Sequence, residues 1–188
     1  MKKAIALLLV FLFCISLCAC GSTSKGSGVL IEDLERAIKD FDDEAKIAVT
    51  ESEEGFTFKY EGSILFGDLT ITGSANKDKN ITQISALGTG INISYFDSLT
   101  SGQLLKDMEN WEKVPINKLS GTFMLWNFSH IVKICSEDKD SKAQMAGIEI
   151  LLEARRASKT SDGWTYTVKS DSGSEAVTIT AVYVGANS

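Results

Sequence analysis

Few side chains in this sequence could carry out acid–base, nucleophilic or metal chemistry. His130 is the only histidine, and Cys135 is the only cysteine outside the amino-terminal segment. A serine–histidine–carboxylate set would have to use His130, and no Gly-x-Ser-x-Gly turn accompanies it. A zinc site needs several histidine or cysteine ligands. The sequence therefore predicts no metal site and no cofactor, and it favours a non-catalytic protein without deciding whether the chain is an enzyme.

Other short patterns that could carry chemistry are better explained by local structure. Ser-x-x-Lys occurs over residues 22–25 and 136–139, in a leash and in an acidic loop where a lysine stays solvated. The segment 76–80 alternates oxygen ligands but lacks the glycine and the terminal acid of a calcium loop, so we expect a tight turn there. Carboxylates are numerous, yet nothing singles out the pair that a glycosidase-like mechanism would need.

The amino terminus has the order of a secretory signal peptide. Two lysines precede an uncharged apolar run over residues 4–19, the usual arrangement of a signal sequence. The order Leu-Cys-Ala-Cys over residues 17–20 resembles the lipobox of bacterial lipoproteins. The resemblance implies transfer of a diacylglyceryl group to the Cys20 thiol and cleavage just before Cys20, and two acyl chains anchor a protein stably.

The expected organisation follows from this resemblance and from chain length. We expect a lipoprotein signal peptide over residues 1–19, an acylated Cys20 with a flexible leash over residues 20–28, and one globular domain over residues 29–188. The resemblance implies a location on the extracytoplasmic face of a bacterial cell membrane or envelope. Cys135 has no partner within the mature domain, so an internal disulfide is excluded. The formal net charge of −6 argues against a nucleic-acid partner.

Hydrophobic periodicity predicts an α+β fold. A helical pattern covers residues 30–41, with Leu30, Leu34, Ile38 and Phe41 on its apolar face. Alternating patterns then predict strands joined by short turns, which favour antiparallel neighbours; they lie at residues 45–49, 56–60, 64–72, 81–87 and 91–95, with one turn at residues 61–63. The expected architecture is an antiparallel β-meander with an N-terminal helix, a three-helix insertion and a C-terminal β-hairpin.

The insertion and the hairpin follow from the second half of the chain. Helical spacing returns at Thr100, where a capping box with Gln103 is expected; the predicted helices cover residues 100–115, 118–135 and about 141–155. Leu104, Met108 and Trp111 share one apolar face in the first of these helices. A hairpin over residues 164–183 closes the domain, and it could pair with the meander or form a separate sheet.

The helix predicted at residues 118–135 is apolar on two sides. At 100° per residue one broad face is formed by Met124, Leu125, Phe128, Ile131, Val132 and Cys135. Phe123, Trp126, His130 and Ile134 form a second stripe roughly opposite. Such a helix either lies between two layers or exposes one stripe to a partner. In the second case Phe123, Trp126 and His130 would be a binding patch, because aromatic residues are enriched at interface anchors.

The function favoured by the sequence is a non-catalytic, lipid-anchored binding or interaction module for an unknown protein or small molecule. Two alternatives remain open at this point: an envelope hydrolase that uses a carboxylate pair, and an accessory subunit of an envelope complex.

Overall fold

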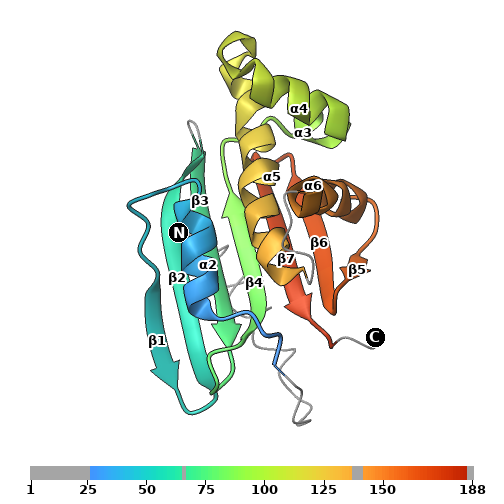
Figure 1. The fold of residues 1–188 in the computed structure, drawn as a ribbon. Coiled ribbons are helices and arrows are strands. Elements are labelled where there is room, and N and C mark those ends of the chain that lie inside the picture. Colours follow the sequence, from blue (N-terminus) through green and yellow to red (C-terminus); the bar gives the residue numbers. More distant parts are fainter. Residues whose placement is uncertain (1–25, 65–66, 137–141, 186–188) are drawn as a thin grey trace.

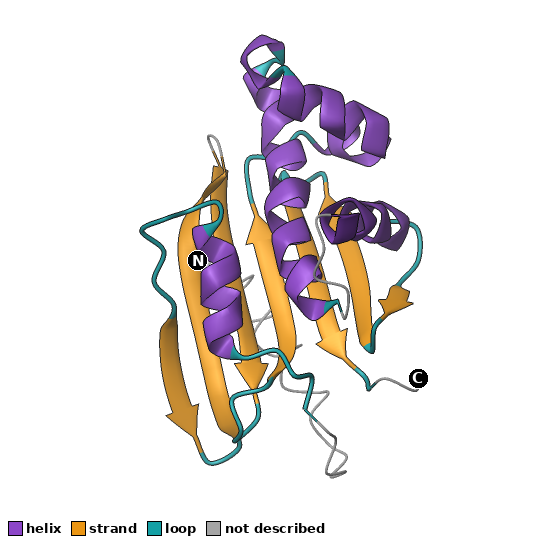
Figure 2. Ribbon diagram, in the orientation of Figure 1, coloured by secondary structure: helices purple, strands orange, loops and turns teal. Residues whose placement is uncertain are grey.

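The computed structural model describes residues 26–64, 67–136 and 142–185, with the side chains of residues 142–144 excepted. Within this part, one seven-stranded antiparallel sheet has the order β1-β2-β3-β4-β7-β6-β5. Helices α2, α5 and α6 lie over one face of the sheet (Figures 1 and 2). The predicted signal peptide and Cys20 lie outside the described residues.

The element bounds are as follows. The strands are β1 (Ala48–Ser52), β2 (Gly55–Ile64), β3 (Gly67–Ala75), β4 (Ile81–Gly88), β5 (Lys159–Ser161), β6 (Trp164–Asp171) and β7 (Ala176–Tyr183). The helices are α2 (Ile31–Lys39), α3 (Ile93–Ser98), α4 (Ser101–Glu109), the short 3-10 helix η1 (Trp111–Lys113), α5 (Ile116–Cys135) and α6 (Lys142–Ala154).

The predicted α+β class is confirmed. The structure also shows whether the closing hairpin pairs with the meander or forms a separate sheet. Strand β4 pairs with β7 in antiparallel register, for example Ile84 opposite Ala181. The hairpin β6–β7 therefore extends the meander into one continuous sheet. The helical insertion between β4 and β5 leaves the sheet and returns to pack on the same face (Figure 1).

The core lies between the sheet and the helices. Alternate residues of each long strand point towards the helices, such as Phe58 and Tyr60 of β2 and Ile179 and Ala181 of β7, and all are at most 3% exposed. The broad apolar face predicted for α5 is confirmed: Met124, Leu125, Phe128, Ile131, Val132 and Cys135 are all buried. Half of the capping box predicted at Thr100 forms: the Thr100 hydroxyl accepts a hydrogen bond from the Gln103 backbone N–H, whereas the Gln103 side chain donates to Asp107.

The turn predicted at residues 61–63 is wrong, because β2 continues through it to Ile64. Gly62 pairs with Leu69 of β3 inside the ladder. The space above Gly62 is filled by the Tyr60 side chain: a Cβ at position 62 would lie 1.9 Å from the Tyr60 hydroxyl oxygen. Glycine is therefore required here for close packing within a strand, not for a turn.

The strand predicted at residues 91–95 is also wrong, because Ile93–Ser98 form α3. The Asn92 side chain accepts a hydrogen bond from the Tyr95 backbone N–H at 3.0 Å, which is the contact of a helix N-cap. Phe96 is fully buried by the helical turn. The Asn92 cap and the helical spacing of Ile93 and Phe96 favour a helix here more strongly than the short alternating pattern favours a strand.

Two helix ends differ from their predicted positions. Helix α4 stops at Glu109, and η1 follows, so Trp111 does not continue the apolar face of Leu104 and is 50% exposed. At the other end of the chain, Leu30 is the N-cap residue of α2 and is 38% exposed. Ile31 takes its expected place in the core, together with Leu34 and Ile38.

Candidate functional site

Phe123, Trp126 and His130 lie on α5, and His130 contacts the segment that follows α2. All three side chains are half-buried, neither enclosed in the core nor fully exposed. Trp126 packs against the edge of the core. The structure brings Trp126 and His130 together, with ring centroids 6.1 Å apart. Part of the stripe is therefore covered, and its role in binding stays a prediction.

His130 is held between α5 and the end of α2. Its Nδ1 lies 3.4 Å from a carboxylate oxygen of Asp40, and its ring centroid is 6.4 Å from that of Phe41. The His130 side chain is 17% exposed. Burial lowers the pKa of His130 below its usual value, and the nearby Asp40 carboxylate opposes that shift. Burial therefore favours the uncharged ring, which has a polar contact with Asp40 and a ring contact with Phe41.

Trp126 offers a test of how strongly this stripe is packed. Trp126→Ala is expected to lower the free energy of unfolding by about 2 kcal/mol, roughly half the loss for a fully buried aromatic residue. The matched control is Trp111→Ala, because Trp111 is 50% exposed and should change stability by less than about 0.5 kcal/mol. Urea denaturation would measure both. A loss at Trp126 no larger than that at Trp111 would mean that the tryptophan of α5 is a bare surface residue.

Cys135 is a packing residue in this fold. The thiol is 5% exposed. Burial raises the pKa of Cys135 well above its usual range, and the nearby Tyr166 hydroxyl of β6 opposes this only in part. Because the thiolate is the reactive form of cysteine, this side chain is unsuited to nucleophilic chemistry.

A buried carboxylate was not singled out by the sequence. Asp107 of α4 is 2% exposed. It accepts hydrogen bonds from the hydroxyl of Tyr95 at 2.5 Å, from Nε2 of Gln103 at 2.7 Å and from the hydroxyl of Thr122 at 3.2 Å. Burial raises the pKa of Tyr95 to about 12, and its bond to Asp107 adds to the shift. The network joins α3, α4 and α5. Because its residues are far apart in the sequence, no local pattern predicts it.

Arg155, just beyond α6, fixes the turn between α3 and α4. Its guanidinium donates hydrogen bonds to the backbone carbonyls of Phe96 and Leu99, and it lies over the Phe96 ring, 5.6 Å from the centroid. These carbonyls belong to the last turn of α3, where a helix lacks internal donors. Arg155 is thus occupied in holding the insertion against α6.

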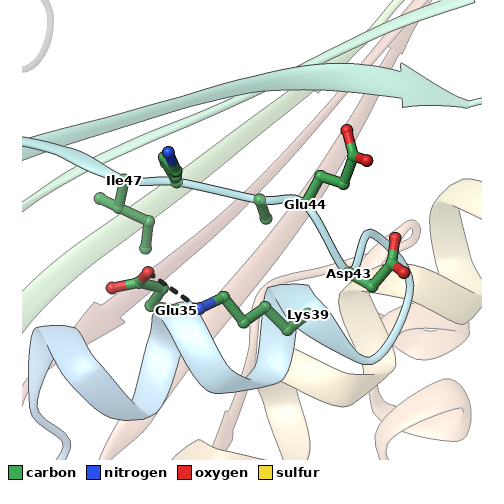
Figure 3. Close-up of a pocket in the computed structure, with 7 residues that line it drawn as sticks. Glu35, Lys39, Asp43, Glu44 and Ile47 are labelled. Carbon is green, nitrogen blue, oxygen red and sulfur yellow. Dashed lines mark ion pairs between the residues drawn. The ribbon is translucent and has the colours of Figure 1, made fainter.

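A shallow groove of about 620 Å³ lies between α2 and the segment that leads into β1 (Figure 3). Its charged residues include Glu35, Lys39, Asp43 and Glu44. Glu35 is paired with Lys39 at 3.3 Å. In Figure 3 the carboxylates of Asp43 and Glu44 point away from this pair. The groove therefore does not assemble the facing carboxylates that the hydrolase alternative requires.

The comparisons with known proteins add no family. The chain matches no protein-family model, no curated protein and no solved structure. In the described part of the chain, no three His, Cys, Asp or Glu side chains are grouped so that they could hold a metal ion. No helix among the described residues is long and apolar enough to cross a bilayer.

Proposed function

We propose that this chain is a lipid-anchored binding module on the extracytoplasmic face of a bacterial cell membrane, without catalytic activity of its own. The anchor is assigned to Cys20, on the strength of the lipobox-like order of residues 17–20. The Phe123, Trp126 and His130 stripe is the proposed contact surface for a protein partner.

One observation carries the non-catalytic part of this proposal: the side chains best suited to chemistry serve the packing of the fold. His130 lies between Phe41 and Trp126, and Cys135 is enclosed beside Tyr166. A general base or nucleophile must reach its substrate within hydrogen-bonding distance. Cys135 is not placed to do so, and His130 is held by its contacts with Asp40, Phe41 and Trp126.

The fold is compatible with a short tether. The backbone N–H of Gly28 donates to the Asn80 side chain, so the described chain begins beside the turn between β3 and β4. A leash over residues 20–25 would reach at most about 20 Å. It would hold this end of the sheet near the bilayer. The α3–α4 end, beyond the other end of β4, would point away from the membrane (Figure 1).

Acylation of Cys20 provides the test. Cells supplied with an alkyne-labelled fatty acid are expected to incorporate it into the wild-type protein. The intact mass of the mature protein should match a chain that begins at Cys20 and carries a diacylglyceryl group. Cys20→Ala should lose the label and retain the signal peptide, because both lipid transfer and cleavage need the thiol. Cys18→Ala is the matched control and should keep the label. Labelling that survives in Cys20→Ala would refute the anchor.

A further inference from the structure

His130 joins α5 to the segment that follows α2, residues 40–45. Its Nδ1 lies 3.4 Å from a carboxylate oxygen of Asp40. Its ring contacts those of Phe41 and Trp126, with centroids 6.4 and 6.1 Å away. The His130 side chain is 17% exposed, and it is the only histidine in the chain. The one side chain whose ordinary pKa lies near neutral pH is therefore placed in the contact between two elements.

The same segment has a second attachment, which does not involve α5. Asp42 accepts a hydrogen bond from the Tyr60 hydroxyl of β2 at 2.6 Å. Ala45, at the other end of the segment, is 3% exposed and belongs to the core. Loss of the His130 contact would therefore free the α2 end of the segment from α5, while the rest of the segment stays attached to the sheet.

A positive charge on His130 is disfavoured in this position. A group that is mostly buried loses much of its hydration, and this raises the free energy of its charged form. Two charged side chains act on the ring: the Asp40 carboxylate favours protonation, and Lys133, one turn further along α5, opposes it. The Asp40 side chain is 61% exposed, so water screens its attraction. The pKa of His130 is accordingly lowered from its usual value of 6.5, with burial as the largest cause.

We propose that His130 is an acid-sensitive latch, which holds residues 40–45 against α5 when the ring is neutral and releases them when the ring is protonated. A charged ring regains hydration if Phe41 moves away from it. That movement would uncover the part of the Phe123, Trp126 and His130 stripe that the segment now covers. The inference rests on the proposed function, in which this stripe is the contact surface and the protein meets the pH outside the cell membrane.

The pH range of release follows from the direction of the pKa shift. In the released form the ring is solvated, and its pKa is the ordinary 6.5. In the closed form the pKa is lower, so between the two values the released form binds more protons. The neutral His130 contact therefore stabilises the closed form in full above pH 6.5. This stabilisation is lost as the pH falls from 6.5 through the lower pKa of the closed form.

The first measurement is a proton NMR titration of the full-length protein, purified in a non-ionic detergent without a histidine tag. The ring signal of His130 is then unique. We expect its pKa to lie below 6.5, and Asp40→Asn should lower it further because the carboxylate favours the charged ring. Asp43→Asn is the matched control, since Asp43 is an exposed carboxylate of the same segment; it should leave the pKa nearly unchanged. A wild-type pKa at or above 6.5 would overturn the proposal.

The second measurement is hydrogen exchange of residues 40–45, at about pH 7.5 and about pH 5, on either side of the ordinary histidine titration. Each exchange rate is divided by the intrinsic rate at the same pH. The backbone N–H groups of Phe41 and Asp42 donate to the carbonyl of Ile38, so their protection reports opening of the segment. We expect this protection to fall several-fold in acid in the wild type. It should stay constant in His130→Phe, which keeps an aromatic ring but does not titrate.

Constant protection in the wild type would overturn the proposal. A fall of the same size in His130→Phe would also overturn it, because carboxylates of the segment, and not His130, would then cause the release. His130→Gln, a second neutral variant, gives the same comparison if His130→Phe does not fold. Neither measurement uses a partner or the lipid anchor. Failure here therefore leaves the anchor proposal intact, and loss of Cys20 labelling would leave the titration of His130 unchanged.

Discussion

Trp164→Ala is expected to lower the free energy of unfolding by about 3–5 kcal/mol, the usual cost of removing a fully enclosed aromatic side chain. Trp164 opens β6 and has no exposed surface. Its ring packs edge-on against Tyr183 with centroids 5.4 Å apart. Because Trp164 and Tyr183 are opposite one another in the β6–β7 ladder, truncation leaves a cavity at the hairpin that completes the sheet.

The control for this prediction is Trp164→Phe, which keeps an aromatic ring in the same space and should cost less than half as much. Urea denaturation monitored by circular dichroism would compare both variants with the wild type. A loss below about 1 kcal/mol for Trp164→Ala would mean that the β6–β7 hairpin is not part of the cooperative core.

Long periodic segments could be predicted from the sequence because one face of each is buried against the rest of the domain. The α5 face from Met124 to Cys135 and the strand β4 follow directly from spacing. Short segments could not be predicted in this way. Residues 91–95 alternate like a strand, and only the Asn92 cap and the burial of Phe96 select the helix.

Gly62 shows a different limit. Glu61, Gly62 and Ser63 have the composition of a turn, and the strand continues through them because of a tertiary arrangement. The Tyr60 ring occupies the space above Gly62, and its hydroxyl donates a hydrogen bond to Asp42 at 2.6 Å. Asp42 lies beyond the end of α2, far from β2 in the sequence. No local pattern contains that contact.

The candidate surfaces could be predicted only in part. Spacing predicted that Phe123, Trp126 and His130 share one side of α5; the structure brings Trp126 and His130 together and leaves all three half-buried. It could not reveal that Asp40 and Phe41 of another segment would cover part of that side.

Asp107→Ala is the second change with a large expected effect, a loss of about 3 kcal/mol of stability. Hydrogen bonds to a charged group each contribute about 1.5–3 kcal/mol, and Asp107 accepts three. Part of the loss is offset because Tyr95 and Gln103 lie near the surface and can bind water instead. The loss should detach α4 from α3 and α5 first, so hydrogen exchange should rise there before it rises in the sheet.

Asp107→Asn separates charge from shape in the same network. It keeps the size of the side chain and one strong acceptor, so we expect a smaller loss of about 1–2 kcal/mol. The pKa of Tyr95, raised to about 12 by burial and by Asp107, should fall towards its usual value of 10. In the wild-type protein, the raised pKa of Tyr95 stabilises the folded state fully below pH 10. This stabilisation is lost as the pH rises from 10 to about 12. Ultraviolet titration of tyrosine ionisation in Asp107→Asn, with Tyr95→Phe to identify the signal, would measure the shift. An unchanged Tyr95 titration would show that burial alone sets its pKa and that the carboxylate does not hold α3 to α4.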